Sequence, residues 1–402
     1  MNDISKTYNR AICWLLYLAL YYYSYRYIFQ YNSAGTSSTY QDTPLIFQIA
    51  KYCIVFLICG IIAVSRFRQK DFLMDRVYIS EYRCMILFTT LLFLDGLLGG
   101  IGMKRCLVYF PVLILYGIGL FPEINMKKIE KIMLIFFFFT LIYEAIQILL
   151  FVIIGRLPAL AWPGTFSIRF GGAWDDPNGY GILLCFYIPF LYHYSWNNKW
   201  LKRIVISLTI IMLLLTQSVT AIFVAFFSVG LVFVIGNIDQ EIRRKRIYIL
   251  LFLCIVMCGF VYYNYDTLLS ISHVNDFLEA KEGSVEGHNV SWKIFSNLPF
   301  WGYLIGRQSV GGGESDFVNF VVMWGIGFYL LFVIIYLLNI TRLCAVVRVT
   351  GSPFWYGSLS FQIAFIISMI NLPCTDMYNV CLLSSLILYL STNQYLIMYH
   401  FE

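Results

Sequence analysis

The sequence predicts an all-α polytopic membrane protein. Of its 402 residues, 60% are hydrophobic and 19% are aromatic, whereas only 12% are charged. A soluble domain carries roughly 25% charged residues, so 28 basic and 22 acidic side chains are too few to cover a water-soluble surface of this chain. The apolar excess therefore faces lipid, and the composition excludes a soluble, disordered or fibrous protein.

Twelve apolar stretches are long enough to cross a hydrocarbon core of about 30 Å as helices. The region 204–236 is too long for one ordinary span, and its polar middle, 216–220, predicts a tight hairpin between two short helices. We therefore expect one integral membrane domain, residues 1–402, with about twelve transmembrane helices. They lie near 11–31, 45–65, 84–100, 106–121, 132–154, 179–195, 204–216, 218–236, 247–264, 317–340, 354–371 and 377–396.

Clusters of Lys and Arg predict the orientation, because cytoplasmic loops of membrane proteins accumulate basic residues. One cluster lies at 199–203 and another at 243–246, so both ends of the 204–236 region are expected in the cytoplasm. The first span is retained, and an even number of spans places both termini in the cytoplasm. The pair Lys104 and Arg105 is the exception, because it falls in a short turn on the outer side.

Two outer loops, 155–178 and 265–316, are long enough to build a functional site. The second has 52 residues, and connections of that length are usually functional or disordered. Its apolar segment 292–305 predicts an amphipathic helix at the membrane surface, so we expect this large loop to be ordered.

The first outer loop ends in the segment RFGGAWDDPNGYG, which begins at Arg169. Arg169 beside paired glycines is suited to holding phosphate oxygens through its guanidinium and backbone N–H groups. A helix cap formed by Asp176 or Asn178, which flank Pro177, explains these residues equally well. Adjacent carboxylates such as Asp175 and Asp176 point apart, so no metal site is predicted there.

In the second outer loop, Arg307 precedes a glycine run and then Glu314 and Asp316 at a helix start. The glycine run lacks the lysine and the spacing of a nucleotide phosphate loop. Acidic residues at a helix N-terminus are explained by the helix dipole, and the alternative is an anion site next to a general base. His288 is the histidine best placed for chemistry.

Several charged residues fall within the predicted spans, where each needs a partner or water. Arg26, Lys51 and Asp95 lie at similar depth, and we predict an ion cluster joining the first three helices. Glu144, with Gln147 on the same helix face, is expected to line a polar cavity. The eleven cysteines lie almost entirely in apolar runs without ligand spacing, so we expect neither a disulfide framework nor a cysteine metal site.

These loop motifs resemble the O-antigen polymerase and ligase superfamily. RFGGAWDDPNGYG resembles the Arg, Gly and Asp-Pro-Asn pattern before a central span, and the segment from His288 through ESDFVNFVVMWGIG resembles the second large periplasmic loop of the polymerases. The family usually has an arginine four residues before a tryptophan, whereas this chain has His288 before Trp292. The stretch 214–221 resembles the polar-tipped helix pair of the family, without its usual Ser-Arg.

The resemblance implies a metal-independent, inverting glycosyltransferase of the C-type membrane fold in the bacterial inner membrane, without a cofactor. It would transfer a growing polysaccharide, O-antigen or capsule, from undecaprenyl diphosphate onto a hydroxyl of the next lipid-linked repeat. The partners implied are that lipid-linked oligosaccharide, membrane lipids, a chain-length regulator and a flippase, and no nucleic acid. Glu314 is the first candidate for the base, followed by Asp316 and His288, and the substrate-binding candidates are Arg169, Arg307, Asp175, Asp176, Asn178 and Trp292.

Two alternatives remain. In O-antigen ligases a histidine pair commonly occupies the place where Glu314, Ser315 and Asp316 stand here, which favours the polymerase. A twelve-span transporter or lipid-linked sugar flippase usually has related halves and short loops, whereas this chain has no internal repeat and one 52-residue outer loop.

Overall fold

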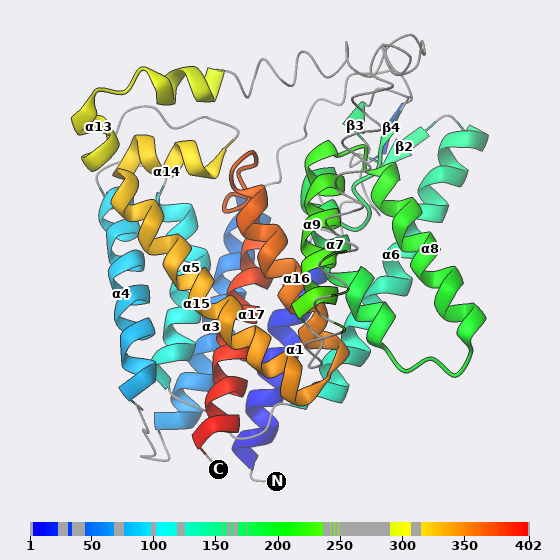
Figure 1. The fold of residues 1–402 in the computed structure, drawn as a ribbon, viewed down its shortest axis with the longest axis horizontal. Helices are drawn as coiled ribbons and strands as arrows, with labels where there is room; N and C mark the ends of the chain where they lie inside the picture. The colour runs from blue at the N-terminus through cyan, green and yellow to red at the C-terminus, as the bar shows by residue number, and fades with distance from the viewer. Residues whose placement is uncertain are drawn as a thin grey trace.

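The fold of the protein comes from a computed structural model (Figure 1). The structure describes residues 3–22, 31–33, 45–67, 76–97, 102–118, 125–154, 156–158, 162–163, 168–174, 176–235, 290–306 and 315–400, together with the single residues 242, 245 and 248.

The described part of the chain is mainly helical, as predicted. Its first eight helices lie before residue 240: α1 (Asp3–Tyr21), α3 (Leu45–Phe67), α4 (Arg76–Leu97), α5 (Gly102–Ile118), α6 (Met126–Ile154), α7 (Pro177–His193), α8 (Lys199–Leu215) and α9 (Val219–Ile235). The helices that follow are α13 (Phe300–Ile305), α14 (Asp316–Trp324), α15 (Ile326–Thr350), α16 (Pro353–Ser368) and α17 (Tyr378–His400).

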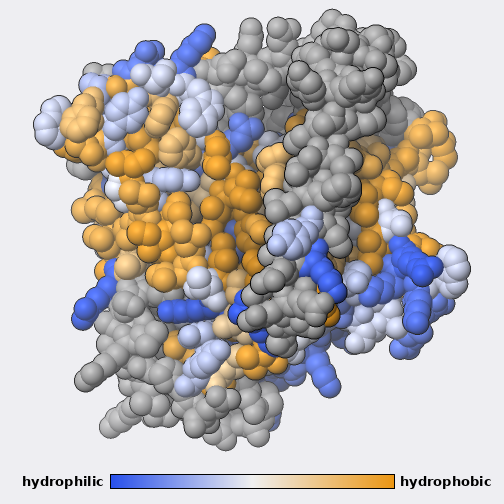
Figure 2. Space-filling view, viewed as in Figure 1, coloured by the Kyte–Doolittle hydropathy of each residue, from blue (hydrophilic) through white to orange (hydrophobic). Residues whose placement is uncertain are grey.

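A helix therefore lies at each predicted range except 247–264, of which only Tyr248 is described. Three helical segments among the described residues are long and apolar enough to cross a membrane: 126–149 in α6, 326–350 in α15 and 378–399 in α17. The described side chains on the face seen in Figure 2 form a hydrophobic band between hydrophilic ones toward both ends. The fold is thus that of an apolar helical bundle with candidate membrane spans.

The first outer loop contains three short strands, and a fourth lies between α1 and α3; the all-α prediction included none of them. Strand β1 (Tyr31–Ser33) pairs antiparallel with β2 (Arg156–Pro158), and β3 (Trp162–Pro163) pairs antiparallel with β4 (Ile168–Arg169). A residue that precedes proline is pushed toward extended backbone, which suits Leu157 before Pro158 and Trp162 before Pro163. Trp162 lies opposite Arg169 in the second pair, so this pairing helps to fix the backbone of Arg169.

The predicted tenth span, 317–340, is wrong in its start, because the helix breaks at Gly325. Gly325 has a φ of 85°, and a Cβ there would lie 2.1 Å from the carbonyl oxygen of Leu304. Gly306 has a φ of 83°, and a Cβ there would lie 2.3 Å from the carbonyl oxygen of Met323. Only glycine combines a positive φ with so close an approach of another backbone segment. With the helix broken at Gly325, α14 lies across the upper end of α15 (Figure 1).

The predicted hairpin in 204–236 is confirmed, with α8 and α9 joined by a turn at 216–218. Gln217 adopts a left-handed φ of 48° at this turn. The Thr216 hydroxyl oxygen accepts a hydrogen bond from the Ser218 N–H at 3.2 Å, and the Ser218 hydroxyl oxygen accepts one from the Ala221 N–H at 3.2 Å. The polar residues thus satisfy backbone groups that the two helix ends leave unpaired.

Both termini lie at one end of the bundle, whereas α13, α14 and the strands β2, β3 and β4 lie at the opposite end (Figure 1). The described parts of the two long loops, 155–178 and 265–316, therefore share an end that is remote from the termini. We call it the loop end.

Helix α7 packs against both α9 and α16, which also pack against each other. It is buried along most of its length. Its contact with α16 is especially close at Gly357, where a Cβ would lie 2.8 Å from both the Phe186 ring and the Phe186 carbonyl oxygen. A side chain at position 357 would therefore push these two helices apart.

We expect Gly357→Ala to lower the free energy of unfolding by about 1–3 kcal/mol, the usual cost of overpacking a core. Thermal unfolding of the purified protein in detergent measures this change. Gly327→Ala in α15 is the matched control, because a Cβ there meets no atom within 4 Å. Equal melting temperatures for the two variants would contradict the close α7–α16 contact.

Candidate functional site

The structure describes five of the predicted site residues, all toward the loop end: Arg169, Asp176, Asn178, Trp292 and Asp316. Asp175, His288, Arg307 and Glu314 lie outside the described residues. The described ones fall into two clusters.

The first cluster surrounds Arg169 at the end of β4. The Arg169 Nε donates to the Thr216 carbonyl oxygen at 3.1 Å, and its Nη2 donates to the Asn178 Oδ1 at 3.0 Å. Asn178 Oδ1 also accepts from the Ser218 hydroxyl at 2.7 Å. We call Arg169, Asp176, Asn178, Thr216 and Ser218 the Arg169 cluster. It joins the first outer loop to the α8–α9 hairpin.

Asp176 caps α7, which confirms one of the two predictions made for the Asp-Pro-Asn segment. Its carboxylate accepts a hydrogen bond from the Asn178 N–H at 2.6 Å, and Pro177 occupies the first turn. Burial lowers the pKa of Arg169, and the charge of Asp176 opposes that shift. Asp176 thus has a structural role and also supplies negative charge near the guanidinium.

The paired glycines do not form the open phosphate cradle that the sequence suggested. Gly172 adopts a φ of 53°, and a Cβ there would lie 2.1 Å from the Cζ atom of Tyr180. The glycines instead form a buried turn that packs on the Tyr180 ring. An anion at this place would be held by the half-buried Arg169 guanidinium, whose Nη1 makes no hydrogen bond with the residues that the structure describes.

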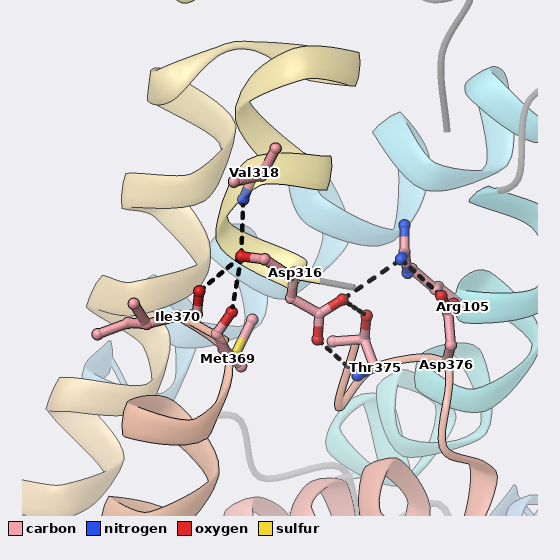
Figure 3. A network of polar contacts seen from close by, with 8 residues as sticks. Arg105, Asp316, Val318, Met369, Ile370, Thr375 and Asp376 are labelled. Atoms are coloured by element: carbon pink, nitrogen blue, oxygen red, sulfur yellow. Dashed lines mark hydrogen bonds and ion pairs between the residues drawn. The ribbon is translucent and has the colours of Figure 1, made fainter. Parts of the chain in front are cut away.

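The second cluster surrounds Asp316 at the start of α14 (Figure 3). Ser315 caps this helix by accepting a hydrogen bond from the Val318 N–H at 3.2 Å, so Asp316 is not the cap. The buried Asp316 carboxylate accepts hydrogen bonds from the N–H and the hydroxyl of Thr375, both at 2.7 Å. It is also within 3.3 Å of the Arg105 Nη2.

Three residues of this cluster were missed as site residues by the sequence prediction: Arg105 in α5, Thr375 and Asp376. The Arg105 Nη2 donates to both Asp316 and Asp376, the latter at 3.2 Å, and the guanidinium stacks over Phe320 and Trp324. The side chains of Arg105 and Asp316 are 0% exposed, whereas that of Asp376 is 42% exposed. We call Arg105, Asp316, Thr375 and Asp376 the Arg105 cluster. Its Asp376 carboxylate is partly exposed, whereas its Asp316 carboxylate is buried.

A sequence signal for Arg105 existed, namely the basic pair on the outer side that departs from the positive-inside pattern. In the structure Lys104 and Arg105 lie in the first turns of α5, so the prediction of a short turn at these residues is wrong. A buried arginine between two carboxylates is stabilised by their charge, so its location does not depend on the loop-charge rule. Asp376 had no comparable signal, because its loop is short and has no recognisable motif.

Burial raises the pKa of Asp316 to about 7. The charge of Arg105 and the hydrogen bonds from Thr375 lower this pKa, and the nearby Asp376 raises it. Desolvation is therefore the largest effect, and the carboxyl titrates close to neutrality.

The loop between α16 and α17, residues 369–377, connects the two clusters. On one side its carbonyl oxygens at Leu372 and Met369 accept hydrogen bonds from the N–H groups of Asp316 and Phe317, at 3.2 Å and 3.0 Å. On the other side Asn371 donates to the Thr220 hydroxyl of α9 at 3.1 Å. The charges of Asp316 and Asp176 both add to the raised pKa of the buried Cys374. The 369–377 loop thus contacts the start of α14 on one side and α9, next to the α8–α9 turn, on the other.

Trp292 in the second outer loop packs near the Arg105 cluster. Its ring lies 5.7 Å from that of Phe295 and 5.8 Å from that of Phe317, which directly follows Asp316. The side chain is 37% exposed. An aromatic surface for a sugar ring is therefore available beside the second cluster.

Charged residues predicted within the spans are also buried. Glu144 and Gln147 of α6 lie inside the bundle, and Glu144 accepts a hydrogen bond from the Tyr180 hydroxyl at 3.1 Å. Lys51 and Asp95 are buried, and the Lys51 ammonium lies 4.6 Å from the centre of the Tyr378 ring. Arg26, the third member of the predicted ion cluster, lies outside the described residues, so that cluster stays a prediction.

Two kinds of chemistry are available in this arrangement. The partly exposed Arg169 guanidinium can bind an anion, and the partly exposed Asp376 carboxylate can accept a proton. In the described part of the chain no three His, Cys, Asp or Glu side chains are grouped so that they could hold a metal ion.

No protein-family model matches the chain, and no curated protein matches it.

We expect Arg105→Ala to destabilise the protein strongly, by about 3–5 kcal/mol, because it leaves a buried carboxylate without its partner. Arg105→Ala combined with Asp316→Asn should recover part of this loss, because the second change removes the buried charge. Thermal unfolding of the purified variants measures both effects. Simple addition of the two single-variant losses would contradict the coupling.

The raised pKa of Asp316 also predicts a pH dependence of stability. The folded protein binds this proton more tightly than the unfolded chain, whose aspartates titrate near about 4. The free energy of unfolding should therefore fall as the pH rises from about 4 to about 7. The contribution is full below that window and lost above it. Asp316→Asn should reduce the slope of melting temperature against pH, and an unchanged slope would show that another group titrates.

Proposed function

We propose that the protein is a membrane glycosyltransferase that polymerises lipid-linked oligosaccharide repeats, of the O-antigen polymerase type. The observation that carries this proposal is the pairing of the two clusters at the loop end. A cationic group and a carboxylate with an exposed face are joined there by the 369–377 loop. Transfer of a glycan from a diphosphate carrier needs both groups within one site.

Arg169 is the proposed contact for the diphosphate leaving group. Negative charge develops on the diphosphate as its bond to the anomeric carbon breaks, and a guanidinium held in advance stabilises that charge. The hydrogen bonds to Thr216 and Asn178 fix Arg169 through its Nε and Nη2. Its Nη1, which makes no hydrogen bond within the described part of the chain, is the proposed donor to an oxygen of the substrate. Arg307 has the same proposed role in the second outer loop.

Asp376 is added to Glu314, Asp316 and His288 as a candidate general base. In the proposed step the acceptor hydroxyl oxygen forms a bond to the anomeric carbon, the bond to the diphosphate breaks, and the hydroxyl proton passes to a carboxylate. Asp316 is fully buried, which favours a positioning role, whereas Asp376 has the exposed face that contact with a hydroxyl requires. Arg105 would hold Asp376 in place.

The proposed setting is the outer face of a bacterial inner membrane, with both termini in the cytoplasm. The two long loops would then lie in the periplasm, where lipid-linked repeats are presented after a flippase has acted. Trp292 would stack on a sugar ring, and a chain-length regulator is the expected protein partner. Ligase and flippase activities are the alternatives, and the phenotype of a deletion separates them.

Deletion of the gene should leave single repeats on the surface glycan carrier, seen as loss of the ladder on electrophoresis. Glycan absent from its acceptor would indicate a ligase instead, and repeats trapped inside the cell would indicate a flippase. Complementation with Arg169→Ala should reduce chain extension by about 10²–10³-fold, the range for loss of a group that stabilises developing charge. Asp376→Asn should reduce it by about 10²–10⁴-fold, the range for loss of a catalytic base.

Lys293→Gln is the control for this experiment, because Lys293 is exposed and lies outside both clusters. It should restore the ladder fully. A normal ladder from both Arg169→Ala and Asp376→Asn, at equal protein levels, would overturn the assignment of the two clusters.

A further inference from the structure

Tyr180 connects the Arg169 cluster to a carboxyl group deep in the bundle. It is the fourth residue of α7, and its hydroxyl donates to the Glu144 Oε2 at 3.1 Å. Glu144 lies ten residues before the end of α6 at Ile154, about 15 Å along the helix axis. Both side chains are buried, with Tyr180 at 0% and Glu144 at 2% exposure.

The Tyr180 ring also supports the turn that carries Arg169. The ring occupies the place where a Cβ of Gly172 would stand, at 2.1 Å. The turn continues into the Asp176 cap, and the Trp174 N–H donates to the Gly171 carbonyl oxygen at 3.0 Å. Movement of the ring would therefore displace the backbone on both sides of Gly172.

Glu144 is held mainly by this one contact. Among the residues that the structure describes, its Oε1 and both amide atoms of the neighbouring Gln147 make no hydrogen bond. A buried polar atom without a partner costs about 1–3 kcal/mol, and a carboxyl within a candidate span is costly in itself. Packing alone does not explain a glutamate at position 144, whereas the need of the Tyr180 hydroxyl for a hydrogen-bond acceptor does.

From these contacts we propose that Glu144 and Tyr180 are positioning residues for Arg169. The Glu144 carboxyl fixes the Tyr180 hydroxyl, the ring fixes the Gly172 turn, and the turn sets the guanidinium toward the substrate. This inference rests on the proposed function for its catalytic meaning. The mechanical link between Glu144 and residues 168–178 does not depend on that function.

Hydrogen–deuterium exchange of the purified full-length protein in detergent tests the link without any substrate. Tyr180→Phe keeps the ring but loses the hydroxyl, and we expect faster exchange of amides in 168–178, with 315–325 unchanged. Tyr187→Phe is the matched control, because that hydroxyl makes a buried bond from α7 to the Met133 carbonyl oxygen of α6 at 3.0 Å, away from the turn. Equal exchange of 168–178 in the two variants would overturn the inference.

Variants of Glu144 separate its role as an acceptor from its charge. Glu144→Ala should increase amide exchange in 168–178 as Tyr180→Phe does. The double variant with both changes should exchange no faster than either single variant. Glu144→Gln keeps an acceptor oxygen and should restore wild-type exchange. Failure of Glu144→Gln, or full additivity in the double variant, would contradict a role through the Tyr180 hydrogen bond.

Chain extension in proteoliposomes with lipid-linked repeats gives the functional readout. Tyr180→Phe and Glu144→Ala should lower kcat by about 10–100-fold with little change in KM, because the guanidinium is misplaced where charge develops. Glu144→Gln should recover kcat. A wild-type protein without activity, together with the expected exchange pattern, would refute the proposed function and leave the mechanical link intact.

Discussion

The arrangement of the loop end depends on one buried arginine. Arg105 comes from α5, and through its Nη2 it holds Asp316 at the start of α14 and Asp376 in the α16–α17 loop. Two carboxylates near one buried position would repel each other without a cation between them. The second outer loop and the last helix hairpin therefore take their relative positions from a charge that lies on neither of them.

Backbone geometry at glycines and caps completes the site around this ion pair. Gly306 and Gly325 allow α13 to cross the junction of α14 and α15 at a distance that no side chain permits. Asp176 and Ser315 cap the two helices that start at the loop end. The loop residues are thus fixed by hydrogen bonds and close packing, which suits the proposed joining of two lipid-linked substrates in one geometry.

The sequence was sufficient for local features and insufficient for contacts between distant segments. Hydropathy and length predicted the helix ranges, and polar residues predicted the 216–218 turn and the Asp176 cap, because these features depend on neighbouring residues. The break at Gly325 depends on the approach of Leu304, and the meaning of Gly172 depends on Tyr180. The pairing of Arg105 with Asp376, 271 residues away in the sequence, has no local signal. Only the predicted exception of Lys104 and Arg105 to the positive-inside pattern pointed to it.

The central claim is that one site at the loop end joins lipid-linked repeats. It is tested most directly by reconstitution of the purified protein in proteoliposomes with a lipid-linked repeat, followed by electrophoresis of the products. The wild-type protein is predicted to form products of two or more repeats with release of the lipid diphosphate, and the Arg169→Ala and Asp376→Asn variants are predicted to leave single repeats. Single repeats with the wild-type protein, or longer products from both variants, would contradict the account.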